Sequence, residues 1–178
     1  HMLGLGNPEI IPLELLSGGE LAADPRDNNS EVNLGGDKEI DSATLEITWD
    51  LSANLSFKSV SNYLEFDRSA ATDLNGTPIQ FFRNDTFENT NQFSQELQLT
   101  WDGERHSTLF GLYYFKENIE ASIDIQGPSV YSDVFERPFI EFYGTLDSKS
   151  YAAFVNSTWE IDDQWSVTGG LRYSEDEK

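Results

Sequence analysis

The chain has 178 residues, of which 32 are Asp or Glu and 11 are Lys or Arg, so its formal net charge is −21. Such an excess repels the phosphates of nucleic acids, and a nucleic acid is therefore not an expected partner. The sequence has no cysteine, which excludes disulfides, thiolate metal sites and cysteine nucleophiles.

Residues 1–38 lack sustained periodicity, and we expect them to form an irregular loop. The first two residues, His1-Met2, are typical of the remnant of a cleaved expression tag. Gly18-Gly19 and the segment that begins at Asp24 are rich in residues that break regular structure. We expect an antiparallel β region to occupy residues 39–178.

The first predicted hairpin covers residues 39–67. Its first arm alternates apolar and polar residues with period two, as a strand with one apolar face does; the apolar positions are Ala43, Leu45, Ile47 and Trp49. On the return arm Leu55 and Phe57 have one parity, whereas Val60, Leu64 and Phe66 have the other. Either a bulge near Ser59 shifts the register, or both faces are partly buried.

The second predicted hairpin covers residues 92–119 and follows a long loop at 68–91. Its first arm has apolar residues at alternate positions, namely Phe93, Leu97, Leu99 and Trp101. A turn at 102–106 leads to the return arm, where we expect Leu109, Gly111, Tyr113 and Phe115 to continue the apolar parity. The third hairpin covers residues 149–176, follows a long loop at 120–148, and turns at Asp162-Asp163.

The sequence therefore predicts an all-β fold of about six antiparallel strands in three hairpins. Short turns alternate with long loops, which is typical of an outer-membrane β-barrel. Tryptophans near the predicted strand ends fit an interfacial aromatic belt; these are Trp49, Trp101, Trp159 and Trp165.

Two groups of side chains are candidates for contact with a ligand. The aromatic residues of the last long loop offer stacking surface; they are Tyr131, Phe135, Phe139, Phe142 and Tyr143. The polar parity of the strands would face the lumen of a barrel and includes Lys58, Glu96, Gln98, Glu160 and Arg172. Packing against a barrel rim explains the first group equally well, and ordinary hydration explains the second.

Catalytic and metal-binding signals are weak. His106 is the single histidine beyond the tag remnant, and we interpret it as a solvated turn residue without a nucleophile to serve. Oxygen-rich segments at Asp24, Asp27 and Asp73 are weak calcium candidates because they lack the spacing of a calcium loop. We expect no enzyme activity and no cofactor.

Two segments, FSQELQLTWDGERHSTLFGLYYFKE and SYAAFVNSTWEIDDQWSVTGGLRYSEDEK, resemble the barrel region of TonB-dependent outer-membrane receptors. The matching residues are Ser94–Leu97, Gly111–Phe115, Tyr151–Phe154 and Gly170–Tyr173, and the segment LSFKSVSNYLEFDRS is similar to the preceding family strand. The resemblance covers residues 41–176 or so. It implies a barrel of about 22 strands around an N-terminal plug, in the bacterial outer membrane, that imports siderophores, glycans or other scarce nutrients with the TonB system.

On this interpretation the chain is an internal part of a receptor and cannot transport alone. Its partners would be the rest of the barrel, the plug, the TonB system and membrane lipid, and the isolated chain is either soluble or dependent on detergent. Two unpaired sheet edges and an apolar wall predict a homo-oligomer of the isolated chain, with Leu45, Ile47, Leu97, Leu99, Leu109 and Leu171 turned inward. A soluble β-barrel or sandwich that binds a small ligand is the alternative, and a β-sheet hydrolase is a weaker one.

Overall fold

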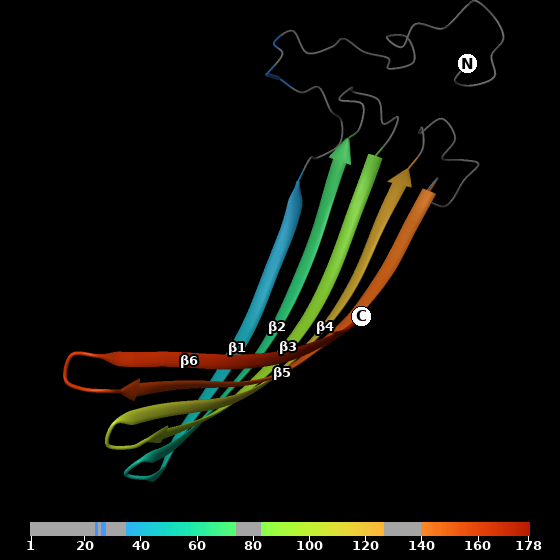
Figure 1. Ribbon diagram of the computed structural model, residues 1–178. Helices are drawn as coiled ribbons and strands as arrows, with labels where there is room; N and C mark the ends of the chain where they lie inside the picture. Colours follow the sequence, from blue (N-terminus) through green and yellow to red (C-terminus); the bar gives the residue numbers. More distant parts are fainter. Residues whose placement is uncertain (1–23, 25, 28–34, 74–82, 127–139) are drawn as a thin grey trace, which may run out of the picture. The chain divides into compact units, whose positions relative to one another are not determined.

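The computed structural model describes residues 24, 26–27, 35–73, 83–126 and 140–178. They form one sheet of six strands that lie in sequence order, β1 to β6 (Figure 1). The strands are β1 (Gly36–Ser52), β2 (Leu55–Asp73), β3 (Arg83–Asp102), β4 (His106–Gln126), β5 (Ile140–Glu160) and β6 (Ser166–Glu177). The predicted all-β fold of three antiparallel hairpins is confirmed.

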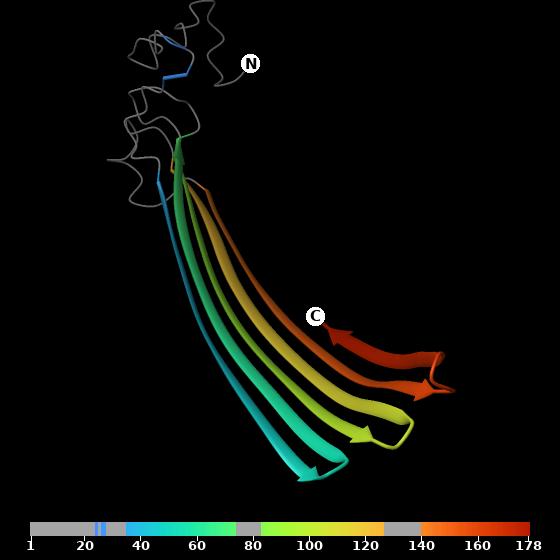
Figure 2. The same ribbon diagram turned by 90° about the vertical axis from the view of Figure 1, so that its left-hand side faces the viewer.

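The chain divides into two units. The first unit contains residues 1–38, 68–87 and 121–143, and the second contains residues 39–67, 88–120 and 144–178. The second unit holds the three short turns, which lie at the same end of the strands (Figure 2). Backbone hydrogen bonds join these turns to their neighbours: the Asp102 N–H donates to the Asn54 carbonyl at 2.9 Å, and the Glu160 N–H donates to the Arg105 carbonyl at 2.8 Å.

The strands run further than the sequence pattern indicates. Parts of both predicted long loops are strand, because β2 continues to Asp73, β3 starts at Arg83, β4 continues to Gln126 and β5 starts at Ile140. One added segment, residues 83–91 of β3, is polar at both parities except for Phe87 and gives no amphipathic signal, whereas backbone pairing does not require one.

Polar side chains bridge neighbouring strands where that signal fades. Asn89 donates to Asp67 at 2.7 Å, and the Tyr63 hydroxyl donates to Asn91 at 2.9 Å. Between β3 and β4, Gln92 donates to Glu117 at 2.7 Å. Cross-strand hydrogen bonds of this kind replace apolar pairs as the lateral contacts of a hydrated sheet.

The register around Ser59 shows no shift. Ser59 and Ser61 both contact Gln95 of β3, while Lys58 and Asn62 contact Glu46 and Thr44 of β1. Side chains therefore alternate without interruption from Lys58 to Asn62, as they do in a regular strand. Of the two explanations left open above, the second holds, since β2 is half-buried on both faces.

The sheet has almost no core of its own. Ala152, with 7% of its surface exposed, is the single buried hydrophobic residue in the part of the chain that the structure describes. All six strands belong to one sheet, and no second sheet is found among the described residues. Among the described residues, no helix has the length and apolarity needed to cross a membrane.

Candidate membrane face and ligand face

Ring contacts define one face of the second unit. Phe93, Tyr114 and Tyr151 lie on neighbouring strands, with ring centroids 6.3 Å apart for Phe93–Tyr114 and 5.2 Å for Tyr114–Tyr151. By alternation this face carries most of the large hydrophobic side chains, and we call it the apolar face. It contains Leu45, Ile47, Trp49, Phe93, Leu97, Leu99, Trp101, Phe110, Leu112, Tyr114, Tyr151, Val155, Trp159, Val167, Leu171 and Tyr173.

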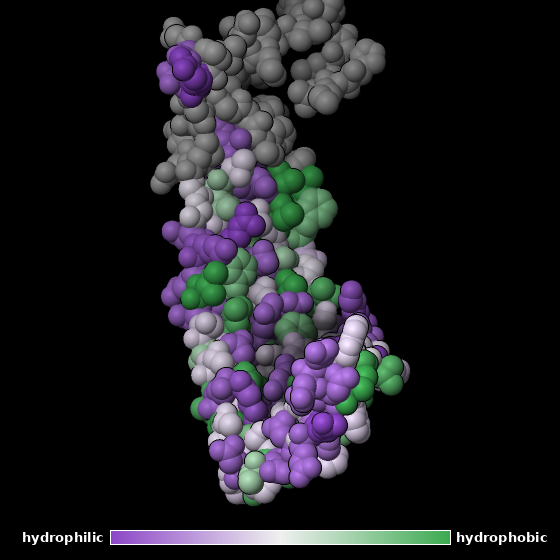
Figure 3. Space-filling view, turned by 60° about the vertical axis from the view of Figure 1, so that its left-hand side comes forward, coloured by the Kyte–Doolittle hydropathy of each residue, from purple (hydrophilic) through white to green (hydrophobic). Residues whose placement is uncertain are grey.

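The opposite face is defined by Arg172. Its guanidinium carbon lies 5.6 Å from the centroid of the Phe154 ring and 5.9 Å from that of Tyr113. The Phe154 ring also covers Gly111, where an added Cβ would overlap it. We call this the mixed face, because charged, polar and aromatic side chains are interspersed on it; one view of the molecule, in Figure 3, shows such an alternation of hydrophilic and hydrophobic residues.

One sequence prediction about these faces is wrong. Leu109, Gly111, Tyr113 and Phe115 lie on the mixed face and do not continue the apolar parity of Leu97 and Leu99. The reason is the turn, which is closed by a 2.7 Å hydrogen bond from the Gly103 N–H to the His106 carbonyl. This bond pairs an odd-numbered residue with an even-numbered one, so the parity switches, and Phe110, Leu112 and Tyr114 complete the apolar face.

The apolar face is exposed to solvent in the isolated chain. Leu171 exposes 79% of its surface and Trp49 exposes 64%. No part of the described chain covers these side chains. A contiguous apolar surface of this kind marks contact with another protein or with lipid.

Tryptophans gather at the turn end of the apolar face. His106 lies between two of them, with its ring 4.5 Å from Trp101 in an edge-to-face arrangement and 5.0 Å from Trp159 in a stacked one. Its Nε2 is buried and has no hydrogen-bond partner. The expectation of a solvated turn histidine is therefore wrong, because Trp101 of the same hairpin and Trp159 of the next one flank its ring.

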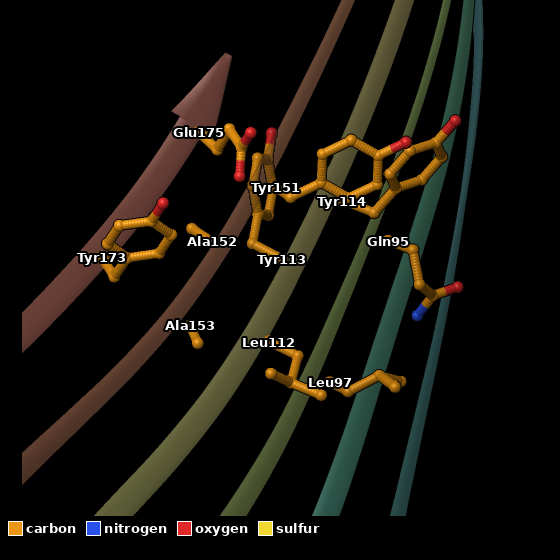
Figure 4. Close-up of a pocket in the computed structure, with 10 residues that line it drawn as sticks. All are labelled: Gln95, Leu97, Leu112, Tyr113, Tyr114, Tyr151, Ala152, Ala153, Tyr173 and Glu175. Atoms are coloured by element: carbon orange, nitrogen blue, oxygen red, sulfur yellow. The ribbon is translucent and has the colours of Figure 1, made fainter. Parts of the chain in front are cut away.

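Tyrosines mark the other border of the apolar face. Tyr114, Tyr151 and Tyr173 line a shallow hollow of about 390 Å³ that extends from β3 to β6 (Figure 4). Leu97 and Leu112 form part of its lining, and Gln95 and Glu175 also line it. The hollow thus joins an aliphatic region to polar groups.

A small polar cluster interrupts the apolar face between β2 and β3. The Gln95 side chain accepts a 2.5 Å hydrogen bond from the Ser61 hydroxyl and donates to the Ser59 hydroxyl at 3.0 Å. Its amide also donates to the Val60 and Glu96 carbonyls, both at 3.2 Å. The amide group of Gln95 is therefore fully used within the sheet, which is how a polar group tolerates an apolar environment.

The five polar-parity candidates named from the sequence share the mixed face, as their even numbers and the strand register require. Lys58 Nζ lies 3.0 Å from Glu46 Oε1, and Gln98 donates to Glu96 at 2.5 Å. Glu160 is paired with Ser166, and Arg172 donates from Nε to the Ser174 hydroxyl at 3.0 Å.

Three of the five aromatic candidates, Tyr131, Phe135 and Phe139, lie outside the residues that the structure describes. Phe142 and Tyr143 belong to β5 and are exposed. A ligand for any of the five remains a prediction.

The calcium candidates do not form a cluster in the described part of the chain. Asp24 accepts hydrogen bonds from the backbone N–H of Arg26 at 2.9 Å and from its guanidinium. These two bonds hold the pKa of the exposed Asp24 carboxyl below its ordinary value. No group of three carboxylate or imidazole side chains that could hold a metal is found among the described residues, which include Asp27 and Asp73.

The paired acids Asp162-Asp163 have a structural role in the last short turn. The Asp162 carboxylate accepts hydrogen bonds from the backbone N–H groups of Gln164 at 2.8 Å and Trp165 at 2.9 Å. This is the local turn chemistry expected of an aspartate before a tight reversal.

Comparisons with known proteins agree with this architecture. Residues 12–178 match the family model described as TonB dependent receptor-like, beta-barrel. Among solved structures, the ferric yersiniabactin uptake receptor FyuA from Yersinia pestis is similar, with a TM-score of 0.63 and 22% identity over 78% of this chain. This chain spans 20% of that one, and the likeness at this identity concerns the fold alone. No curated protein matches the sequence.

Proposed function

The chain belongs to the TonB-dependent receptor β-barrel family, and we propose that it forms six neighbouring strands in the wall of an outer-membrane receptor. The intact protein would import a siderophore, a glycan or another scarce nutrient. The chain alone would not transport, because an open sheet of six strands encloses no lumen. The family is one of receptors and not of enzymes.

The observation that carries this proposal is the apolar face with aromatic residues at both borders. On β5, Trp159 follows Tyr151 by eight positions, which corresponds to about 27 Å along an antiparallel strand. A strand tilt of about 35–45° reduces this to a height of about 20 Å, close to the apolar band of an outer-membrane barrel. Tryptophan and tyrosine are the residues that favour the boundary between lipid and water.

The mixed face would then line the lumen. Its carboxylates, amides and cations hydrogen-bond to one another across strands and would remain in contact with water. Alternation gives each strand one lipid-facing and one lumen-facing set of side chains. Lys58, Glu96, Gln98, Glu160 and Arg172 are accordingly our lumen-facing residues.

The proposed partners follow from the two free edges of the sheet. β1 and β6 have neighbours on one side only, and all of their residues are exposed. In the intact receptor they would pair with further barrel strands, around a plug that engages the TonB system. The isolated chain would instead pair with a second copy of itself, because an open edge accepts another strand.

Binding of the nutrient is proposed for the exposed aromatic residues at the start of β5. Phe142 and Tyr143 on β5 expose 56% and 65% of their surfaces. Neighbouring strand residues point to opposite faces, so Phe142, which has the parity of the mixed face, is the ring that would stack on a ligand in the lumen. FyuA is an uptake receptor for ferric yersiniabactin. A siderophore is therefore our first ligand class for this chain, and a glycan the second.

The soluble alternative lacks support in the described chain. A ligand-binding barrel needs a closed wall and an interior, but β1 and β6 are not neighbours in this sheet. A hydrolase needs a nucleophile beside its base, and the imidazole of His106 is flanked by indole rings.

The test uses the absence of cysteine in the chain, which permits single cysteines to be placed at will. We expect Leu97→Cys and Leu171→Cys, in the chain reconstituted into phospholipid vesicles, to resist a water-soluble maleimide. Glu96→Cys and Gln98→Cys should react with it. Equal reaction at all four positions would refute the assignment of the two faces.

A second measurement addresses the state of the isolated chain. Size-exclusion chromatography with light scattering should show a non-aggregated species only in detergent, and far-UV circular dichroism should show that this species is rich in β-structure. A compact monomer in plain buffer would contradict a lipid-facing apolar face.

A further inference from the structure

Arg172 on the mixed face makes contacts with two aromatic rings and a hydroxyl group. The register pairs it with Phe154, and its guanidinium lies over the Phe154 and Tyr113 rings at 5.6 and 5.9 Å. A guanidinium over aromatic faces is attracted by the ring quadrupoles. Arg172 also donates a hydrogen bond from Nε to the Ser174 hydroxyl at 3.0 Å.

Gly111 makes this arrangement possible. A Cβ at that position would overlap the Phe154 ring. Because glycine leaves the space open, the ring lies against the β4 backbone and offers its other face to Arg172. The cation is thus positioned by packing before any ligand arrives, which lowers the entropy lost on binding.

The guanidinium retains unused hydrogen-bond donors. Arginine has five N–H donors, and Nε accounts for one of them here. Lys58 and Arg172 are the two cations that the described strands of the second unit place on the mixed face. Lys58 has Glu46 at 3.0 Å, whereas no described carboxylate lies within ion-pair distance of Arg172.

We propose that Arg172, stacked on Phe154 and Tyr113, is a binding site for a carboxylate group of a small-molecule ligand. The planar fork of Nη1 and Nη2 matches a carboxylate in a bidentate geometry, which an ammonium group cannot provide. In a chain with a formal net charge of −21, an anionic ligand needs such a local cation to approach the wall. This inference rests on the proposed function, since it places Arg172 in a water-filled lumen.

The experiment is calorimetric titration of the reconstituted full chain with citrate, a tricarboxylate, at constant ionic strength. We expect saturable binding by the native chain and no heat with glycerol, which is uncharged. Arg172→Gln should weaken citrate binding by about tenfold or more, because hydrogen bonds to charged groups are the strong ones. Arg172→Lys should give an intermediate affinity, since it keeps the charge and loses the fork.

The matched control is Arg105→Gln, which removes the same charged group from a short turn of β3–β4. It should bind citrate within about twofold of the native chain, since the two sites do not share partners. Far-UV circular dichroism of each variant confirms the fold. The proposal is overturned if the native chain shows no saturable binding, if Arg172→Gln binds normally, or if Arg105→Gln loses as much affinity.

The outcome is separable from that of the proposed function. If cysteine labelling gives the expected result for the two faces but citrate does not bind, only the proposed carboxylate site at Arg172 is refuted. If Leu97→Cys and Leu171→Cys react in water, the receptor wall itself is refuted, whatever citrate does.

Discussion

The two faces of the second unit are built from the same strands, yet their side chains differ in whether they find contact partners within the sheet. On the mixed face, Lys58 pairs with Glu46 and Arg172 lies over two rings. On the apolar face, Leu171 and Trp49 expose 79% and 64% of their surfaces, and no described residue covers them. The polar side chains of the mixed face thus form contacts that are compatible with water. The hydrophobic side chains of the apolar face have no apolar surroundings in the isolated chain.

This difference shows where the stability of such a chain must come from. A soluble domain buries its apolar residues against another layer, but here a single layer has one buried hydrophobic residue, Ala152, in the described part. The missing layer is lipid if the proposed function is right. The following predictions test this contrast between the faces.

The largest effect is expected from a charge on the apolar face. Leu97→Arg should lower the free energy of unfolding in phospholipid vesicles by about 2–4 kcal/mol, the cost of arginine near the bilayer midplane. Urea unfolding followed by tryptophan fluorescence measures it. Gln98→Arg, one position along β3 on the mixed face, is the control and should change the free energy of unfolding little. Equal losses for the two variants would show that the two faces do not contact different surroundings, lipid and water.

The polar cluster of the apolar face should be the next most sensitive site. Gln95→Ala removes four hydrogen bonds and leaves the Ser61 and Ser59 hydroxyls without their partner. We expect a loss of about 1–3 kcal/mol in the same unfolding experiment. Adding Ser59→Ala and Ser61→Ala should recover most of the lost free energy of unfolding, because these changes remove the two hydroxyl groups that Gln95→Ala leaves without a hydrogen-bond partner. A triple variant less stable than Gln95→Ala would contradict a lipid environment.

Packing on the mixed face gives a smaller effect. Gly111→Ala should displace the Phe154 ring and cost about 1 kcal/mol. Gly169→Ala is the matched control, since an added Cβ there meets nothing within 4 Å. Thermal unfolding by circular dichroism compares the two, and equal midpoints would show that Phe154 moves aside without cost.

The sequence was sufficient for the architecture and for most face assignments. Alternation identified β1, residues 93–101 of β3 and β6 correctly, because one face of each of these segments is apolar and the other polar. It failed at the polar extensions, such as 83–91 of β3, where hydrogen bonds such as Asn89–Asp67 support the strand. Such bonds depend on the neighbouring strand and leave no periodic signal.

The site was predictable only in part. Lys58, Glu96 and Arg172 could be assigned to one face by parity within each strand. The parity switch between Gly103 and His106 could not, because it depends on which backbone groups close the turn. The rings around Arg172 follow from that switch, since it brings Tyr113 to the mixed face.

The weakest expected effect concerns the ion pair of the mixed face. Lys58 Nζ and Glu46 Oε1 are 3.0 Å apart, and both side chains are well exposed. A double-mutant cycle of Lys58→Gln and Glu46→Gln should give a coupling of about 0.2–1 kcal/mol in low salt. In about 1 M salt, where the screening length is about 3 Å, the coupling should vanish. A large coupling that survives high salt would mean that the pair is shielded from water, and the mixed face would then be an interface with another part of the protein and not a wall of the lumen.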